Sequence, residues 1–219
     1  MASYKAHMAF GILTGIVWSI IIALFSIIAF WLIPIVFIIT VIGAFLPDLD
    51  SDSGVPMRIL LQFLSLASAI IFLFYVYKLD VKNLYLIVGW SIFIIFFVYY
   101  GLGGILKKMT RHRGIFHSVP AAILSVLISL SIVNFFNIPS VTKIIVSLSV
   151  GLGYFSHLLL DEMNSVVNLE GVPFFPKKSL GSALKLFSKN KIVSSLVYLA
   201  VIVLLWSNWE TFVEAFSEI

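Results

Sequence analysis

The chain has 219 residues, of which 61% are hydrophobic and 11% are charged, and its formal net charge is +4. Soluble domains carry roughly 25% charged residues, so this composition, with a mean hydropathy of +1.13, indicates an integral membrane protein. The apolar runs are continuous rather than alternating, which favours helices over a barrel. The absence of cysteine excludes disulfides and thiolate chemistry. The small positive charge is typical of juxtamembrane loops, so we expect membrane lipid and no nucleic acid as partners.

The apolar pattern predicts an all-α, polytopic bundle of about six or seven membrane-spanning helices. Residues 8–46 are too long for one helix, and the break near Trp31–Pro34 predicts two. The alternative, a single long span, would place His7 and Asp48 on opposite faces of the membrane. Because no signal-peptide cleavage site follows the apolar run, we expect it to be retained. Further spans are expected at residues 59–77, 84–106, 118–137, 144–161 and 192–206.

Shorter signals place the connections between these spans. Gly11 and Gly15 form a small-xxx-small pair that lets another helix approach closely. Ser118, with Pro120 soon after, predicts a capped helix start. An amphipathic segment is expected over residues 162–190, followed after the last span by an acidic tail. No repeat or low-complexity linker divides the sequence, so we predict one integral membrane domain over residues 1–219.

The distribution of lysine and arginine predicts the orientation. With seven crossings, eleven of the 14 basic residues lie on the side of the N-terminus, and only Lys78, Lys82 and Lys143 lie on the other. This bias follows the positive-inside rule, so the first side is predicted to be cytoplasmic. We therefore expect a multi-pass protein of the cell inner membrane.

In this topology all four histidines fall at the cytoplasmic face. His157 and Asp161 are spaced i, i+4 on one helix face, and an imidazole and a carboxylate at this spacing can bind one metal ion. Ionisable residues near the bilayer are costly and usually functional. The alternative for this pair is a helix-end carboxylate beside an interfacial histidine. His7 is of interest because it shares the same face.

Acidic residues follow the second predicted span. Asp48 and Asp50 come directly after Pro47, and together they could bridge two metal ions. An EF-hand is excluded because Ser53 and Ile59 occupy the positions of its glycine and its bidentate glutamate. The alternative is a solvated acidic turn, which is the better interpretation for Asp52.

Two histidines and two arginines lie together between the fourth and fifth predicted spans. His112 and His117 suit metal binding, or a metal ligand and a general acid–base group. Arg113 suits a phosphoryl oxygen or a developing oxyanion, whereas Arg111 is better explained as an anchor to anionic headgroups. The roles of the two histidines stay open. No nucleophile elbow and no Walker loop is present.

Four motifs in this order resemble one family: His7-x3-Gly11, Leu46–Asp50, His112-Arg113-Gly114-x2-His117-Ser118, and His157-x3-Asp161. It is the family of bacterial and archaeal inner-membrane proteins described as metal-dependent hydrolases, some of them LexA-regulated. The similarity covers roughly residues 1–180. It implies a multi-span protein with a divalent-metal site at His7, Asp48, Asp50, His112, Arg113, His117, His157 and Asp161.

We therefore expect a metal-dependent membrane hydrolase with one or two divalent ions, zinc being the first choice. His7, Asp48, Asp50, His112, His117, His157 and Asp161 are the expected ligands. Arg113, His117 and Asp50 are the expected catalytic residues, acting on a lipid or other phosphoester. The ligand types are similar to those of zinc-dependent phospholipases C, whereas residues 149–161 lack the arginine of phosphatidic-acid-type phosphatases. Two alternatives remain: a transporter or metal-binding protein, and a non-catalytic scaffold.

Overall fold

The computed structural model describes residues 3–50, 55–79, 81–104, 117–166, 184–187 and 191–218. In this part of the chain every regular element is a helix, which confirms the predicted all-α class. The chain divides into two compact units. The first unit comprises residues 1–47 and 115–219, and the second comprises residues 48–114. One integral domain over residues 1–219 stays a prediction.

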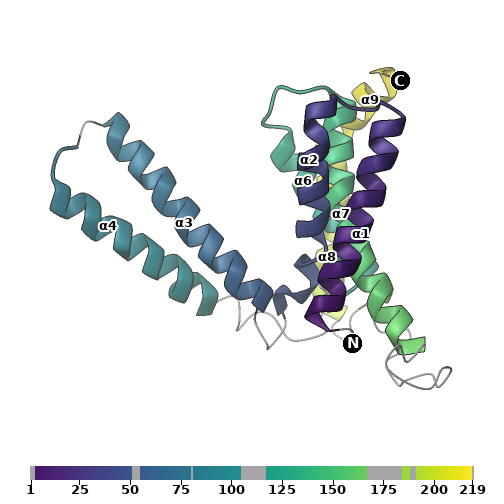
Figure 1. Ribbon diagram of the computed structural model, residues 1–219, viewed down its shortest axis with the longest axis horizontal. Helices are drawn as coiled ribbons and strands as arrows, with labels where there is room; N and C mark the ends of the chain where they lie inside the picture. The colour runs from purple at the N-terminus through teal and green to yellow at the C-terminus, as the bar shows by residue number, and fades with distance from the viewer. Residues whose placement is uncertain are drawn as a thin grey trace. The chain divides into compact units, whose positions relative to one another are not determined.

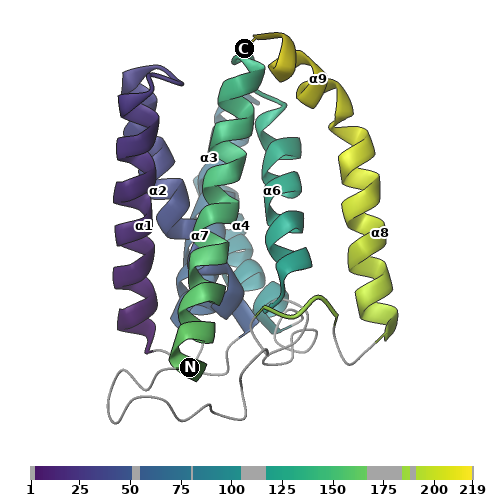
Figure 2. The same ribbon diagram turned by 90° about the vertical axis from the view of Figure 1, so that its right-hand side faces the viewer.

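The first unit is a bundle built around one central helix, α7. Figure 2 shows α7 between α1 and α6, with α8 on the far side of α6. α2 packs against both α1 and α7. The helices of this unit are α1 (Tyr4–Leu24), α2 (Ile33–Gly43), α6 (Val119–Val133), α7 (Ser140–Val166), α8 (Lys191–Ser207) and α9 (Trp209–Glu218), with a short 3₁₀ turn, η1 (Phe30–Leu32), before α2.

The first apolar stretch is two helices, as predicted. α1 ends at Leu24, and Ser26 follows in the left-handed region with φ 49°. The amide of Ile27 then bonds back to the carbonyl of Ile22 at 3.3 Å, which closes the last turn of α1. Pro34 lies in the first turn of α2, where its missing N–H costs nothing. His7 and the residues after α2 therefore lie at the same end of the first unit.

Glycine allows α2 and α7 to approach until their backbones touch. A Cβ on Gly153 of α7 would collide with the carbonyl oxygen of Thr40, and a Cβ on Gly43 of α2 would collide with that of Val150. α1 approaches α2 in the same way, since a Cβ on Gly11 would lie 2.6 Å from the Cβ of Ala44. This confirms the close helix approach predicted at Gly11, and it is how apolar helices associate without a hydrophobic driving force.

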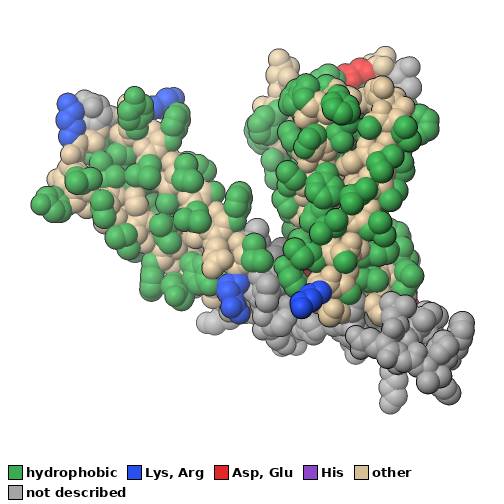
Figure 3. All heavy atoms as spheres, viewed as in Figure 1, with side chains coloured by type: hydrophobic (Ala, Val, Ile, Leu, Met, Phe, Trp, Pro, Cys, Tyr) green, Lys and Arg blue, Asp and Glu red, His purple; other side chains and the backbone are tan. Residues whose placement is uncertain are grey.

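The second unit is a helical hairpin (Figure 1). It consists of α3 (Val55–Lys78) and α4 (Leu84–Phe96), and α4 continues into a π-helical turn, η3 (Phe97–Leu102). Asn83 caps α4, since its side-chain oxygen accepts from the amide of Leu86 at 3.2 Å. Figure 3 shows hydrophobic side chains over much of the visible described surface of each unit, as expected for surfaces that contact lipid. Lysines and arginines lie at the helix ends of the second unit, whereas the first unit has a basic side chain at one end and acidic side chains at the other.

Five described helices are long and apolar enough to cross a membrane. They begin at Tyr4, Phe30, Met57, Leu84 and Ser140, and the α8–α9 pair, bent by 50°, would make a sixth. This confirms a polytopic bundle. The prediction for residues 118–137 was too long, because α6 ends at Val133 after 15 residues, fewer than the roughly 20 needed to span. α7 is longer than residues 144–161, since it runs to Val166.

Side-chain amides join α6 to the bend between α8 and α9. Asn208, at the bend, is 2% exposed. Its side-chain carbonyl accepts from the amide nitrogen of Asn134 at 2.8 Å, and its own amide donates to Ser131 at 2.9 Å. Thr211 donates to the side-chain oxygen of Asn134 at 3.1 Å. These bonds satisfy polar groups that would be costly to bury alone, and they fix where the chain turns from α8 into α9.

The acidic tail is helical, and two of its carboxylates cap the start of α7. Glu218 accepts from the amides of Ser140 at 3.0 Å and Val141 at 2.9 Å. Glu214 accepts from the hydroxyl of Ser140 at 2.7 Å. A helix N-terminus has unpaired amides and a partial positive charge, so carboxylates stabilise it there. The central helix is thus held at one end by α9.

Substitution of Gly153 by alanine tests the close approach of α2 and α7. The added Cβ would meet the carbonyl of Thr40, and such overpacking costs about 1–3 kcal/mol. We expect a clearly lower Tm in detergent for Gly153→Ala. Gly89→Ala is the matched control, because nothing lies within 4 Å of a Cβ there, and helix propensity favours alanine. Equal Tm values for the two variants would contradict the packing described.

Candidate metal centre

The candidate site starts from two residues on one face of α7. His157 and Asp161 lie one turn apart, and they are 1% and 7% exposed. The sequence placed Asp161 at the end of a helix, but α7 continues to Val166. Asp161 is therefore a side chain within the helix rather than at its end. Burial of a carboxylate is costly unless other groups compensate its charge.

A backbone carbonyl fixes the orientation of His157. Its Nδ1 lies 2.8 Å from the carbonyl oxygen of Ala44, the residue that follows α2. Because a carbonyl oxygen only accepts, Nδ1 donates this hydrogen bond, and the neutral ring then presents the Nε2 lone pair. Histidines that bind metal are commonly oriented by such a bond from the second ring nitrogen. Nε2 of His157 faces Asp161 Oδ2 at 3.9 Å.

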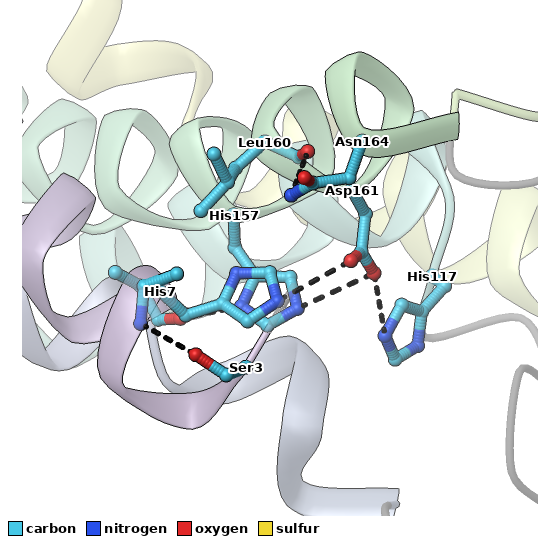
Figure 4. Close-up of polar contacts among 9 residues, drawn as sticks. Ser3, His7, His117, His157, Leu160, Asp161 and Asn164 are labelled. Atoms are coloured by element: carbon cyan, nitrogen blue, oxygen red, sulfur yellow. Dashed lines mark hydrogen bonds and ion pairs between the residues drawn. The ribbon is translucent and has the colours of Figure 1, made fainter. Parts of the chain in front are cut away.

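His7 reaches the same carboxylate from α1. Its Nε2 lies 3.3 Å from Asp161 Oδ1, and its ring stacks on that of His157 with centroids 3.7 Å apart and planes at 9°. His7 is 3% exposed, and its Nδ1 has no hydrogen-bond partner in the described part of the chain. Figure 4 shows the two stacked rings with their edges toward Asp161.

His117 completes the group from the residue before the cap of α6. It is 2% exposed, and its Nε2 lies 3.9 Å from Asp161 Oδ2. Its ring meets that of His157 edge-on at 5.5 Å and 70°. The next residue, Ser118, caps α6 as predicted by accepting from the amide of Ala121 at 3.4 Å. In Figure 4 His117 approaches Asp161 from the side opposite His7.

This arrangement has the dimensions of a metal site. One ligand atom each from His117, His157 and Asp161 can lie within 4.8 Å of the others, and the contacts of Asp161 with the three imidazoles are 3.3–3.9 Å. Two ligands that each lie about 2.1 Å from a tetrahedral zinc ion are roughly 3.4 Å apart. The buried ligand atoms of His117, His157 and Asp161 therefore lie close enough together to hold a metal ion.

The structure brings together four of the residues predicted from the sequence, and these four come from three separate helical segments. His7, His117, His157 and Asp161 meet at the end of the first unit where α1 and α6 begin (Figure 2). Ala44 was missed, because a backbone carbonyl acts there and no side-chain type signals it. The position of Ala44 directly after Gly43 at a helix end was the available hint, since terminal carbonyls lack helical partners.

The remaining predicted residues belong to the second unit. Asp48 is its first residue and is half-buried in the short turn η2 (Leu46–Asp50), directly after the buried Pro47. The predictions for the Asp50 side chain and for Arg111, His112 and Arg113 lie outside the described residues.

Comparison with family models identifies the group to which this protein is related. A model described as YdjM inner membrane protein matches residues 1–217. The chain belongs to the YdjM inner membrane protein family. This confirms the resemblance seen in the four motifs, and it agrees with the apolar helices in identifying a multi-pass inner-membrane protein. Comparisons with curated proteins and with solved structures found no match.

Replacement of Asp161 tests the metal centre. We expect wild-type protein, purified without chelator and given zinc, to retain about one ion or more per chain. Asp161→Asn should lower zinc affinity by more than the roughly 10–100-fold loss that second-shell changes cause. Asn164→Ala is the control, since Asn164 lies on the same helix and its amide bonds only to the backbone of Leu160 in the described contacts. Elemental analysis by mass spectrometry measures the zinc content of the two variants. Equal zinc content in Asp161→Asn and Asn164→Ala would contradict the assignment.

Proposed function

We propose that this protein is a metal-dependent hydrolase that acts on a lipid phosphoester at the cytoplasmic leaflet. The single observation that supports this most is the convergence of three buried imidazoles on the buried carboxylate of Asp161. Such a donor set inside a chain with so few charged residues is costly without a function.

In this proposal His7, His157 and Asp161 hold the first ion, and His117 or His112 completes its ligands. Asp48 and Asp50 provide further carboxylates for a second ion. A bound zinc ion supplies a Lewis acid that lowers the pKa of water to near neutrality. The hydrogen bond from His157 to Ala44 keeps the ligand ring in one orientation.

The other predicted residues have roles in binding and proton transfer. Arg113 binds the phosphoryl oxygens through its planar guanidinium group and stabilises the charge that develops on them. Asp50, or whichever of His112 and His117 is not a ligand, moves a proton between water and the leaving group. The eleven basic residues assigned to the cytoplasmic side support an opening toward anionic headgroups of that leaflet.

The main alternative is a transporter that passes a cation or protons through the same residues. Transporter sites usually lie near the bilayer midplane between discontinuous helices. His7 instead lies in the first turns of α1, and His117 lies just before α6. A location at the helix ends favours an enzyme. Zinc flux into proteoliposomes, without hydrolysis of any lipid, would support the transporter instead.

Metal removal tests the hydrolase directly. Protein treated with chelator should lose nearly all activity on a panel of phospholipids and phosphorylated lipids in mixed micelles. Added zinc should restore it. The released products can be measured by mass spectrometry. Metal-free protein that keeps full activity would refute the proposal.

Paired variants separate the roles of the two open histidines. His112→Gln and His117→Gln should differ in bound zinc if only one of them is a ligand. The variant that keeps its zinc should lose activity by roughly 10²–10⁴-fold and change the pH dependence of kcat/KM, as expected for loss of an acid–base group. If both variants keep both zinc and activity, neither histidine has the proposed role.

A further inference from the structure

The C-terminal helix, α9, crosses the end of the first unit that lies away from the histidines. Near its start, Thr211 donates to the side-chain oxygen of Asn134, which directly follows α6. In its last turn, Glu218 accepts from the amide of Ser140 at the start of α7. Figure 2 shows α9 running at the top from the end of α8 toward α7. The axis of α9 therefore follows the end of the bundle and does not continue that of α8.

Two faces of α9 have different surroundings. Thr211 and Ala215, spaced i, i+4, are buried against the unit. Trp209, Val213 and Phe216 recur at i, i+4 and i+7, so they share another face, and all three are exposed. A helix with this pattern has protein on one side and a second apolar medium on the other. In a multi-pass membrane protein that medium is lipid.

Acidic side chains on a third side of α9 exclude it from the membrane interior. Glu210, Glu214 and Glu218 recur once per turn and are exposed, and ionisable groups inside a bilayer are costly. The preceding helix, α8, has 17 residues, which is the lower limit of the roughly 17–25 that cross a bilayer. α8 therefore makes the crossing alone, and the 50° bend between α8 and α9 is where the chain leaves the hydrocarbon.

Tryptophans mark the level of this bend as a membrane–water interface. Three of the five tryptophans in the chain are exposed at this end of the first unit. Trp31 lies in η1, between α1 and α2, and Trp206 and Trp209 lie on either side of the bend. Tryptophan gathers where acyl chains meet headgroups, because its ring is apolar and its N–H is polar. This signal is independent of the pattern along α9.

We infer that α9 lies in the membrane interface at the end of the unit opposite the candidate metal centre and binds the lipid surface. Trp209, Val213 and Phe216 enter the boundary between headgroups and acyl chains. Glu214 and Glu218 meanwhile hold the start of α7, so α9 fixes the depth of α7 in the bilayer. This lipid-binding surface is separate from the proposed hydrolase site and does not depend on it.

Spin labels test the depth of α9 in the full-length protein. The chain has no cysteine, so each variant carries one label, and its collision rates with oxygen and with a nickel chelate give its depth in phosphatidylcholine vesicles. Labels at Val213→Cys and Phe216→Cys should both reach roughly 5–10 Å into the boundary between headgroups and acyl chains. A label at Glu210→Cys should lie shallower by roughly 5 Å, half the helix diameter. Leu199→Cys, exposed in the middle of α8, is the deep reference.

Three outcomes would overturn the inference. Labels in water at Val213 and Phe216 would mean that α9 has left the membrane. A label at Glu210 as deep as the one at Leu199 would make α9 part of a bent span. Low collision rates with both reagents at Val213 would indicate a protein partner, such as a second copy of the chain. Tm checks the folding of each variant, and Trp209→Cys, on the same face, replaces Phe216→Cys if that variant does not fold.

Discussion

The site depends on how closely α1, α2 and α7 approach one another around Ala44. The methyl group of Ala44 touches the space left open by Gly11 of α1, and its carbonyl oxygen accepts from His157 of α7. Gly43 and Gly153 bring α2 and α7 to backbone contact just before this point along both helices. Packing by small residues commonly serves only to join helices. Here it also positions the side chains of His7 and His157 relative to the carboxylate of Asp161.

Asp161 explains why these segments converge. A carboxylate that is 7% exposed in an apolar bundle needs compensation by charge or hydrogen bonds. His7, His117 and His157 supply it from α1, from the residue before the cap of α6, and from α7 itself. A divalent ion would satisfy the same requirement more fully, since it brings positive charge to all four groups. The buried ionisable residues of the described bundle are thus concentrated at one point.

Local sequence signals predicted much of this arrangement. Three of these signals depend on only a few neighbouring residues and can therefore be recognised in the sequence. They are the i, i+4 spacing of His157 and Asp161, the break before Pro34 and the cap at Ser118. Helix ends were predicted less well. Asp161 and Glu162 suggested a membrane boundary, but charge marks where lipid ends and not where a helix ends, so α7 continues to Val166.

Long-range polar pairs were not predictable in the same way. The hydrogen bonds of Asn208 to Asn134 and of Glu218 to the start of α7 join residues more than 70 positions apart. No local sequence pattern around one partner indicates which residue is the other. The contact of Ala44 with His157 belongs to the same class, because it uses a backbone atom. Hydropathy and spacing therefore predict the helices and the ligand types, while tertiary packing decides which groups meet.

The cap of α7 by Glu214 and Glu218 has a consequence for biogenesis. In the described contacts the amides of Ser140 and Val141 both donate to Glu218, which lies 78 and 77 positions later in the chain. During synthesis α7 is therefore inserted with its first turn open, and it becomes fully anchored only after α8 and α9 have emerged and folded back.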